Sequence, residues 1–105
     1  MQEIDVDQLA DRVAAGGRLI DVREPDEYTG GHVPGALSVP LATVPDHLDV
    51  FRGDEPVAVI CHSGGRSRRA VEHLAEHGID AANVEGGTAA WIASGRATVA
   101  GDRPS

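Results

Sequence analysis

The chain has 105 residues, of which 41% are hydrophobic and 25% are charged. This length suits one globular domain with a single core and excludes a second domain. Seventeen acidic residues against nine basic ones give a formal net charge of -8, which excludes a surface built to attract nucleic acid or anionic membrane. The single cysteine excludes an internal disulfide framework and a metal cluster held by cysteines alone.

Short strands and helices alternate along the chain. In chain order, the expected elements are a helix over residues 6–13, a strand at 18–23, at most a helical turn at 24–31, a strand at 37–39, a helix around Pro45, a strand at 57–61, a helix from Ser67 that Gly78 ends, a strand within 81–87 and a helix within 88–95. Asp5 or Asp7 is expected to cap the first helix. The alternation indicates βαβ units and a mainly parallel sheet.

Three stretches carry the strongest local signals. Residues 57–61 are a continuous apolar run, too short for a typical helix and typical of a strand buried on both faces. After Ser67 the apolar residues change to a helical period. The last helix makes Trp91 and Ile92 available to the core, and the tail from about residue 99 is expected to be loosely held.

No membrane span or secretion signal is indicated. The sequence has no long apolar run, and its start, MQEIDVDQLADRV, lacks the basic residues and apolar centre of a secretory signal. We therefore expect a cytoplasmic protein, a monomer, with no nucleic-acid or membrane partner.

The only cysteine lies where a buried strand is expected to end, in the stretch VAVICHSGGRSRRAVEHL. Ligands of open parallel sheets bind at the carboxyl ends of strands, so Cys61 occupies a candidate site. Gly64 and Gly65 permit positive φ, which lets several N–H groups turn inward and line a nest for an anion. With a helix starting near Ser67 and Arg66 close by, a thiolate here should have a lowered pKa and be nucleophilic at neutral pH.

Three of the nine basic residues fall within four positions of each other. We expect Arg66 to face the loop and touch the reacting atoms, while Arg68 and Arg69 diverge around the helix, as solvated charges or as charges that steer a substrate. The alternative for Cys61 is a buried free cysteine that closes an apolar strand. The glycines and Arg66 favour the reactive thiol, because a core cysteine needs no anion-binding loop.

Three blocks, LIDVREPDEYTGGHVPGAL, VICHSGGRS and NVEGGTAAW, stand in the order and at the spacing of the rhodanese family. The chain resembles a single-domain member of that family over nearly its whole length, which implies one domain over residues 1–105. The resemblance implies a three-layer α/β fold, with a mainly parallel central sheet of four or five short strands flanked by helices. It also implies the activity of a thiosulfate sulfurtransferase. In that reaction the loop cysteine takes sulfane sulfur from a small anionic donor and holds it as a persulfide. The acceptor is cyanide or a thiol, and the thiol belongs to a small molecule or to a protein.

The resemblance also assigns roles within the loop, and it implies no cofactor and no metal. Cys61 becomes the catalytic sulfur carrier, with Arg66 as the second catalytic residue. The rest of the loop is expected to bind the substrate: His62, Ser63, Gly64, Gly65 and Ser67. Upstream, Asp21, Arg23 and Glu27 look structural in the family, with Arg23 able to pair with Glu27.

Two other functions use similar residues. Cysteine-dependent phosphatases and arsenate reductases also place a thiolate, an N–H cradle and an arginine around an oxyanion. Related phosphatases have five residues between cysteine and arginine, whereas four separate Cys61 from Arg66, which gives a tighter ring better suited to sulfur. There are two further alternatives. One is a non-enzymatic module that binds a partner protein, and the other is a persulfide relay to a protein acceptor.

The histidines are weaker candidates. His62 adjoins Cys61, but neighbours in a tight loop usually point apart, so we expect a solvent-facing or rim position. His73 and His77 have the spacing of a helical metal pair without an evident third ligand, and we interpret them as exposed or half-buried. His32 lies in a specified turn, GHVPGA, where a structural hydrogen bond is expected.

Overall fold

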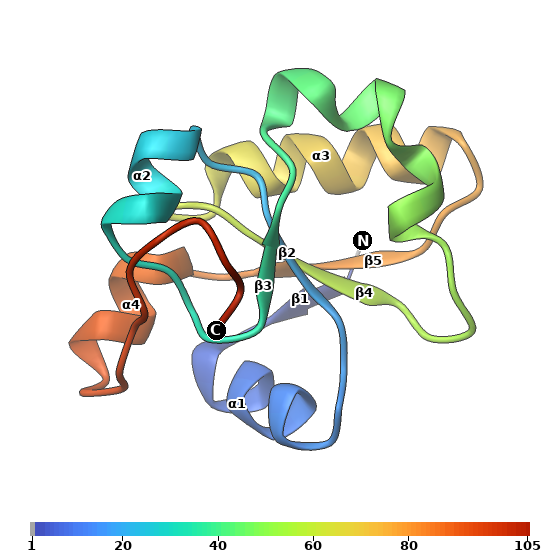
Figure 1. Ribbon diagram of the computed structural model, residues 1–105. Helices are drawn as coiled ribbons and strands as arrows, with labels where there is room; N and C mark the ends of the chain where they lie inside the picture. Colours follow the sequence, from blue (N-terminus) through green and yellow to red (C-terminus); the bar gives the residue numbers. More distant parts are fainter. Residues whose placement is uncertain (1) are drawn as a thin grey trace.

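The computed structural model of the protein describes residues 2–105, and a five-stranded sheet runs through its centre (Figure 1). The strands are β1 (Gln2–Ile4), β2 (Leu19–Asp21), β3 (Ala36–Ser38), β4 (Val57–Ile60) and β5 (Ala81–Val84). They lie in the order β1-β5-β4-β2-β3, and every neighbouring pair is parallel. The predicted α/β fold with a parallel sheet is confirmed.

Helices cover both faces of the sheet and complete three layers (Figure 1). They are α1 (Val6–Ala14), α2 (Pro25–Gly30), α3 (Gly65–Glu76) and α4 (Gly87–Ala93), with 3₁₀ helices η1 (Leu41–Asp46) and η2 (Leu48–Phe51). One buried apolar cluster joins the sheet to α3, η1 and η2, and a second joins it to α1, α4 and Tyr28 of α2. Within the described residues, no helix has the length and apolar character needed to cross a membrane.

Strand β4 shows why the core has two halves. Val57 and Val59 belong to the cluster beneath α3, while Ala58 and Ile60 belong to the cluster beneath α1 and α4. Side chains alternate between the faces of a strand, and all four are buried, so β4 is covered on both faces as its continuous apolar sequence predicts.

Helix α1 begins at a capping box. The Asp5 carboxylate accepts a hydrogen bond from the Gln8 N–H at 2.8 Å, and the Gln8 side chain accepts one from the Asp5 N–H at 2.9 Å. This arrangement satisfies two of the backbone donors that a helix start leaves unpaired. Of the two predicted caps, the structure uses Asp5.

Four elements differ from the sequence-based prediction. α2 is a six-residue helix where at most a helical turn is expected. β1 is not among the predicted strands, because a three-residue edge strand containing a glutamate shows no apolar alternation. Around Pro45 the chain forms two 3₁₀ helices in place of one helix, since proline supplies no N–H for continuous helical bonding. Helix α3 starts at Gly65, two residues before the predicted start at Ser67.

The carboxyl-terminal part corrects two further expectations. Trp91 is buried, but the neighbouring Ile92 is 57% exposed and lies outside the core. The tail that we expect to be loose is instead hydrogen-bonded to the turn after α2. Val99 and His32 exchange backbone hydrogen bonds at 2.9 Å, and the Gly35 N–H donates to the Pro104 carbonyl at 2.9 Å.

His32 is part of the same attachment. Its ring is buried and stacks on Tyr28, with 3.7 Å between the ring centroids. Its Nδ1 lies 2.9 Å from the Tyr28 carbonyl oxygen, and its Nε2 lies 2.7 Å from the Arg103 carbonyl oxygen. The structural hydrogen bond predicted for His32 is therefore confirmed, and it ties the tail to the body of the domain.

Candidate active site

Cys61 follows β4 directly, at the edge of the sheet where the carboxyl ends of the parallel strands meet. The residue is only 1% exposed. Its Sγ accepts hydrogen bonds from the Gly64 N–H at 3.1 Å and from the Ser67 hydroxyl at 3.3 Å. The loop therefore wraps its donors around the sulfur, which is the arrangement that the predicted N–H nest requires.

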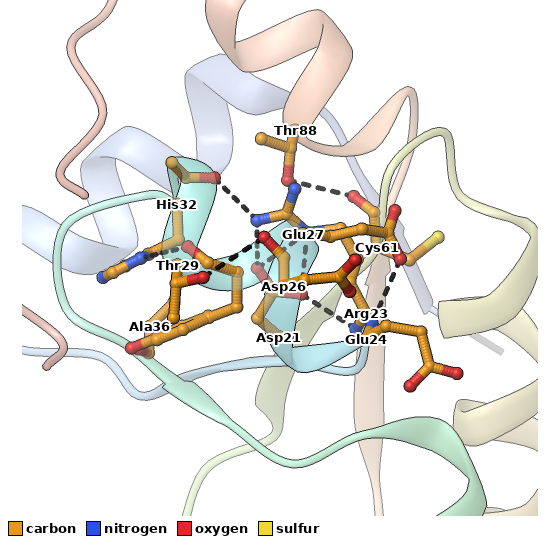
Figure 2. A network of polar contacts seen from close by, with 12 residues as sticks. Asp21, Arg23, Glu24, Asp26, Glu27, Thr29, His32, Ala36, Cys61 and Thr88 are labelled. Atoms are coloured by element: carbon orange, nitrogen blue, oxygen red, sulfur yellow. Dashed lines mark hydrogen bonds and ion pairs between the residues drawn. The ribbon is translucent and has the colours of Figure 1, made fainter. Parts of the chain in front are cut away.

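The carbonyl oxygens at the start of the loop are held by α4. The Cys61 carbonyl accepts hydrogen bonds from the N–H and the hydroxyl of Thr88, at 2.9 and 3.1 Å (Figure 2). The His62 carbonyl accepts one from the Ala89 N–H at 3.0 Å. Because the first turn of α4 satisfies these acceptors, the loop can keep its donors on the side of the sulfur.

The glycines of the loop have different roles. Gly64 has φ of 111° and precedes the first residue of α3, so it supplies the left-handed turn that leads from loop to helix. Gly65 is exposed and has no positive φ, which corrects the expectation that both glycines use this freedom. The loop thus depends on a glycine at position 64 for its backbone conformation.

Opposing effects set the pKa of the Cys61 thiol. Burial raises the pKa, but hydrogen bonds from the Ser67 hydroxyl and from the backbone N–H groups of Ser67, Gly64 and Ser63 outweigh burial and leave it below its ordinary value. These bonds stabilise the charged form. A larger fraction of Cys61 is therefore thiolate at neutral pH than for a free cysteine.

Ser67→Ala is expected to raise the pKa of Cys61, because it removes the side-chain donor to the sulfur and keeps the backbone. The rate of alkylation by iodoacetamide at pH 7 should fall roughly threefold, the effect of losing about 0.7 kcal/mol of hydrogen bonding. The measurement is the alkylation rate against pH, with Ser38→Ala, an exposed serine on β3, as the matched control. An unchanged profile would show that the Ser67 hydroxyl does not stabilise the thiolate.

Arg66 is held by Glu27 of α2. Its Nη1 and Nη2 donate to the two carboxylate oxygens of Glu27, at 2.7 and 3.0 Å. Within residues 2–105 the guanidinium makes no hydrogen bond to Cys61, so the structure does not contain the expected contact of Arg66 with the sulfur. The hydrogen bonds from Arg66 lower the pKa of Glu27 to about 2, and the same pair raises the pKa of Arg66. The guanidinium of Arg66 is thus paired beside the loop.

The predicted pairing of Arg23 with Glu27 is wrong. Arg23 instead pairs with Asp21, with 2.9 Å between Nη2 and Oδ2, and also donates to the Gly31 carbonyl at 2.8 Å (Figure 2). Both side chains of this pair are nearly fully buried. A buried guanidinium takes the nearest buried carboxylate, which leaves Glu27 free to hold Arg66.

Behind the sulfur lies a polar network that the sequence analysis missed. The Ser67 hydroxyl oxygen also lies within hydrogen-bond distance of the side-chain oxygen of Asn83, so its single proton is shared between that oxygen and Sγ. The Asn83 amide donates to Glu3 at 3.1 Å and to the Gly64 carbonyl at 3.3 Å. Arg68 in turn contacts Glu3 at 3.4 Å. The signal was available, since an asparagine inside the buried strand AANV must have hydrogen-bond partners.

The remaining predicted residues lie at the rim. His62 and Ser63 are exposed, in agreement with the rim position expected for His62. Arg69 is also exposed on α3, whereas Arg68 is partly engaged by Glu3. The structure therefore brings Gly64 and Ser67 onto the sulfur and leaves the other loop side chains around it.

A surface hollow lies elsewhere on the molecule. It has a volume of about 670 Å³ and is lined by residues such as Arg12, Gly17, Arg18 and Pro56. These residues precede β2 and β4, so the hollow lies at the amino ends of the strands, opposite Cys61. The candidate catalytic residues lie at the opposite edge of the sheet.

The fold and the loop together define a class of domain: a parallel α/β sheet that presents one cysteine thiol, in a ring of hydrogen-bond donors, at its carboxyl edge. A family model, the rhodanese-like domain, matches residues 5–94, and the chain belongs to the rhodanese family.

Similar proteins cover most of the chain. A sulfurtransferase of Allochromatium vinosum is 34% identical over 103 residues, which are 95% of this chain and 96% of that protein. The crystal structure of a rhodanese-like domain protein from Staphylococcus aureus superposes with a TM-score of 0.81 at 39% identity and covers 87% of this chain and 91% of that one. A thiosulfate sulfurtransferase from Pseudomonas aeruginosa gives a TM-score of 0.83 at 30% identity, over 96% of this chain and 20% of that one.

Proposed function

We propose that the protein is a sulfurtransferase that moves sulfane sulfur from thiosulfate or a similar small donor to a thiol or cyanide, through a persulfide on Cys61. The observation that carries the proposal is the sulfur's environment: a buried Sγ that accepts hydrogen bonds from the Gly64 N–H and the Ser67 hydroxyl. The sulfurtransferases among the similar proteins support the same chemistry.

The loop suits both halves of such a reaction. The Cys61 thiolate attacks the outer sulfur of thiosulfate, the sulfur–sulfur bond of the donor breaks, and sulfite leaves with the bonding electrons. The new persulfide is an anion, and donors aimed into the loop stabilise its terminal sulfur. An acceptor thiolate or cyanide then attacks that terminal sulfur and returns Cys61 as a thiolate. A persulfide is more acidic than a thiol, so the transfer requires no strong general acid.

The position of Arg66 favours sulfur over phosphate. Enzymes that act on phosphate benefit from an arginine that binds two phosphate oxygens at once. Here both of the terminal nitrogens of Arg66 are engaged by Glu27, at 2.7 and 3.0 Å. A phosphate or arsenate would have to displace a carboxylate to gain this contact, and this supports the sulfurtransferase over the phosphatase or arsenate reductase.

The intact sulfur environment also favours transfer over simple protein binding. A module that only docks a partner gains nothing from a buried thiol with two donors on its sulfur. A persulfide relay to a protein acceptor uses the same first half-reaction, so it differs from a small-molecule enzyme only in the identity of the acceptor.

Treatment of the reduced protein with thiosulfate is expected to add one sulfur atom to Cys61, because the loop stabilises the persulfide anion. Intact mass measurement and peptide mapping after removal of the donor would locate the sulfur, and cyanide should release it as thiocyanate in equal amount. Absence of a sulfur adduct and of sulfite release with thiosulfate and with organic persulfides would refute the proposed function.

A further inference from the structure

The positive charge of the Cys61 loop is already neutralised. Arg66 is the only arginine or lysine among residues 61–67. Its guanidinium makes two hydrogen bonds to the Glu27 carboxylate, and the side chains are 31% and 34% exposed, respectively. A partly buried bidentate pair of this kind is more persistent than an exposed ion pair. The loop therefore offers little net charge to an incoming anion.

Glu27 is fixed from both sides. Besides the two bonds from Arg66, its carboxylate accepts a hydrogen bond from the Glu24 N–H at 3.1 Å, as part of the capping box of α2. Its pKa of about 2 keeps the carboxylate ionised at every pH near neutrality. The pairing is thus a permanent feature of the site and is not removed by protonation.

The surroundings of the loop add negative charge. Figure 2 shows Glu24, directly before α2, and Asp26, on α2, together with Glu27 and Cys61, and the carboxylates of Glu24 and Asp26 are exposed. Glu85, directly after β5, is exposed as well, and Arg68 is offset by Glu3 at 3.4 Å. Arg69 on α3 is one exposed positive charge against these three carboxylates. The exposed carboxylates around the loop therefore outnumber the exposed guanidinium groups there, and this excess has the same sign as the net charge of the whole chain, -8.

Two donors of the loop are already engaged by the Cys61 sulfur before any donor molecule binds. The Gly64 N–H and the Ser67 hydroxyl both donate to Sγ. The charged end of a donor molecule must lie outside this ring, next to the Arg66–Glu27 pair. Thiosulfate brings two negative charges to that position, whereas an organic hydropersulfide of the form R–S–SH brings one or none.

We propose that the preferred sulfur donor is a small organic hydropersulfide of low net charge, and that the Glu27 carboxylate on Arg66 disfavours thiosulfate. The inference rests on the proposed sulfurtransferase function. In the transfer, the Cys61 thiolate attacks the outer sulfur of R–S–SH, the sulfur–sulfur bond of the donor breaks, and RS⁻ leaves. The proton of the hydropersulfide passes to that leaving thiolate, so Cys61 ends as a persulfide anion and the donor as RSH.

The test compares thiosulfate with 2-aminoethyl hydropersulfide, whose ammonium group offsets the persulfide charge, in wild type and in Glu27→Gln. In wild type, kcat/KM for the hydropersulfide should exceed that for thiosulfate by about tenfold or more. Glu27→Gln keeps a side-chain oxygen that can accept the Glu24 N–H, but it removes the negative charge that offsets Arg66. The ratio of kcat/KM for the hydropersulfide to kcat/KM for thiosulfate should therefore fall about fivefold. Glu76→Gln, at the far end of α3, makes the same change in net charge and should leave the ratio as in wild type.

Ionic strength gives a second measurement that needs no variant. If the site repels the dianion, salt should raise the wild-type rate with thiosulfate and leave the rate with 2-aminoethyl hydropersulfide nearly constant. Equal use of both donors, or the same ratio in Glu27→Gln as in wild type, with sulfur still carried on Cys61, would overturn the donor preference alone. Failure of both donors to place sulfur on Cys61 would overturn the proposed function with it.

Discussion

Cys61→Ser is expected to abolish sulfur transfer, with kcat/KM falling by about 10³-fold or more. The reason is chemical, because a serine hydroxyl is not ionised near neutral pH and holds no persulfide. No other thiol can take its place, since the chain contains one cysteine. That cysteine is 1% exposed, and its Sγ accepts two hydrogen bonds. The measurement is the rate of sulfite or thiocyanate release over a range of donor concentrations, together with the mass of the treated protein.

The fold should survive this substitution. A serine oxygen is smaller than sulfur and can accept the same hydrogen bonds from Gly64 and Ser67. Far-UV circular dichroism and the thermal midpoint should therefore stay close to those of wild type. Wild-type protein whose thiol has been alkylated should show the same loss of activity. Substantial transfer by a folded Cys61→Ser protein would place the chemistry on another residue.

The position of the thiol was predictable because it depends on neighbours in sequence. A buried strand ends at Cys61, glycine follows three residues later, and a helical pattern begins soon after. Parallel strands with helical crossovers bring such a loop to the carboxyl edge of the sheet. The structure places Gly64 and Ser67 on the sulfur accordingly.

Long-range polar partners were not predictable in the same way. Arg66 and Glu27 are 39 residues apart, and the choice between Asp21 and Glu27 for Arg23 depends on which carboxylate is buried beside it. Periodicity and spacing do not reveal the direction of a long side chain. Asn83 was partly predictable. An asparagine in a buried strand must have hydrogen-bond partners, but the sequence does not show which residues they are.

Gly87→Ala is expected to destabilise the domain by about 2–4 kcal/mol, because it adds a methyl group where two backbones meet. A Cβ on Gly87 would lie 2.5 Å from the Cys61 carbonyl oxygen and 2.6 Å from the His62 carbonyl oxygen. These are the groups that bind the first turn of α4, so α4 and the loop must separate. The residue also has φ of 58°, the left-handed region that favours glycine.

Thermal unfolding should show this cost as a fall of roughly 10–25 °C in Tm. The displacement should also weaken the Gly64 donor to Sγ, so the pKa of Cys61 should rise and alkylation at neutral pH should slow. Gly65→Ala is the matched control, because a Cβ there meets no atom within 4 Å and φ is not positive. Alanine in the first turn of α3 should leave stability unchanged or raise it slightly. Equal Tm values for the two variants would mean that contact between α4 and the loop does not hold the thiol in place.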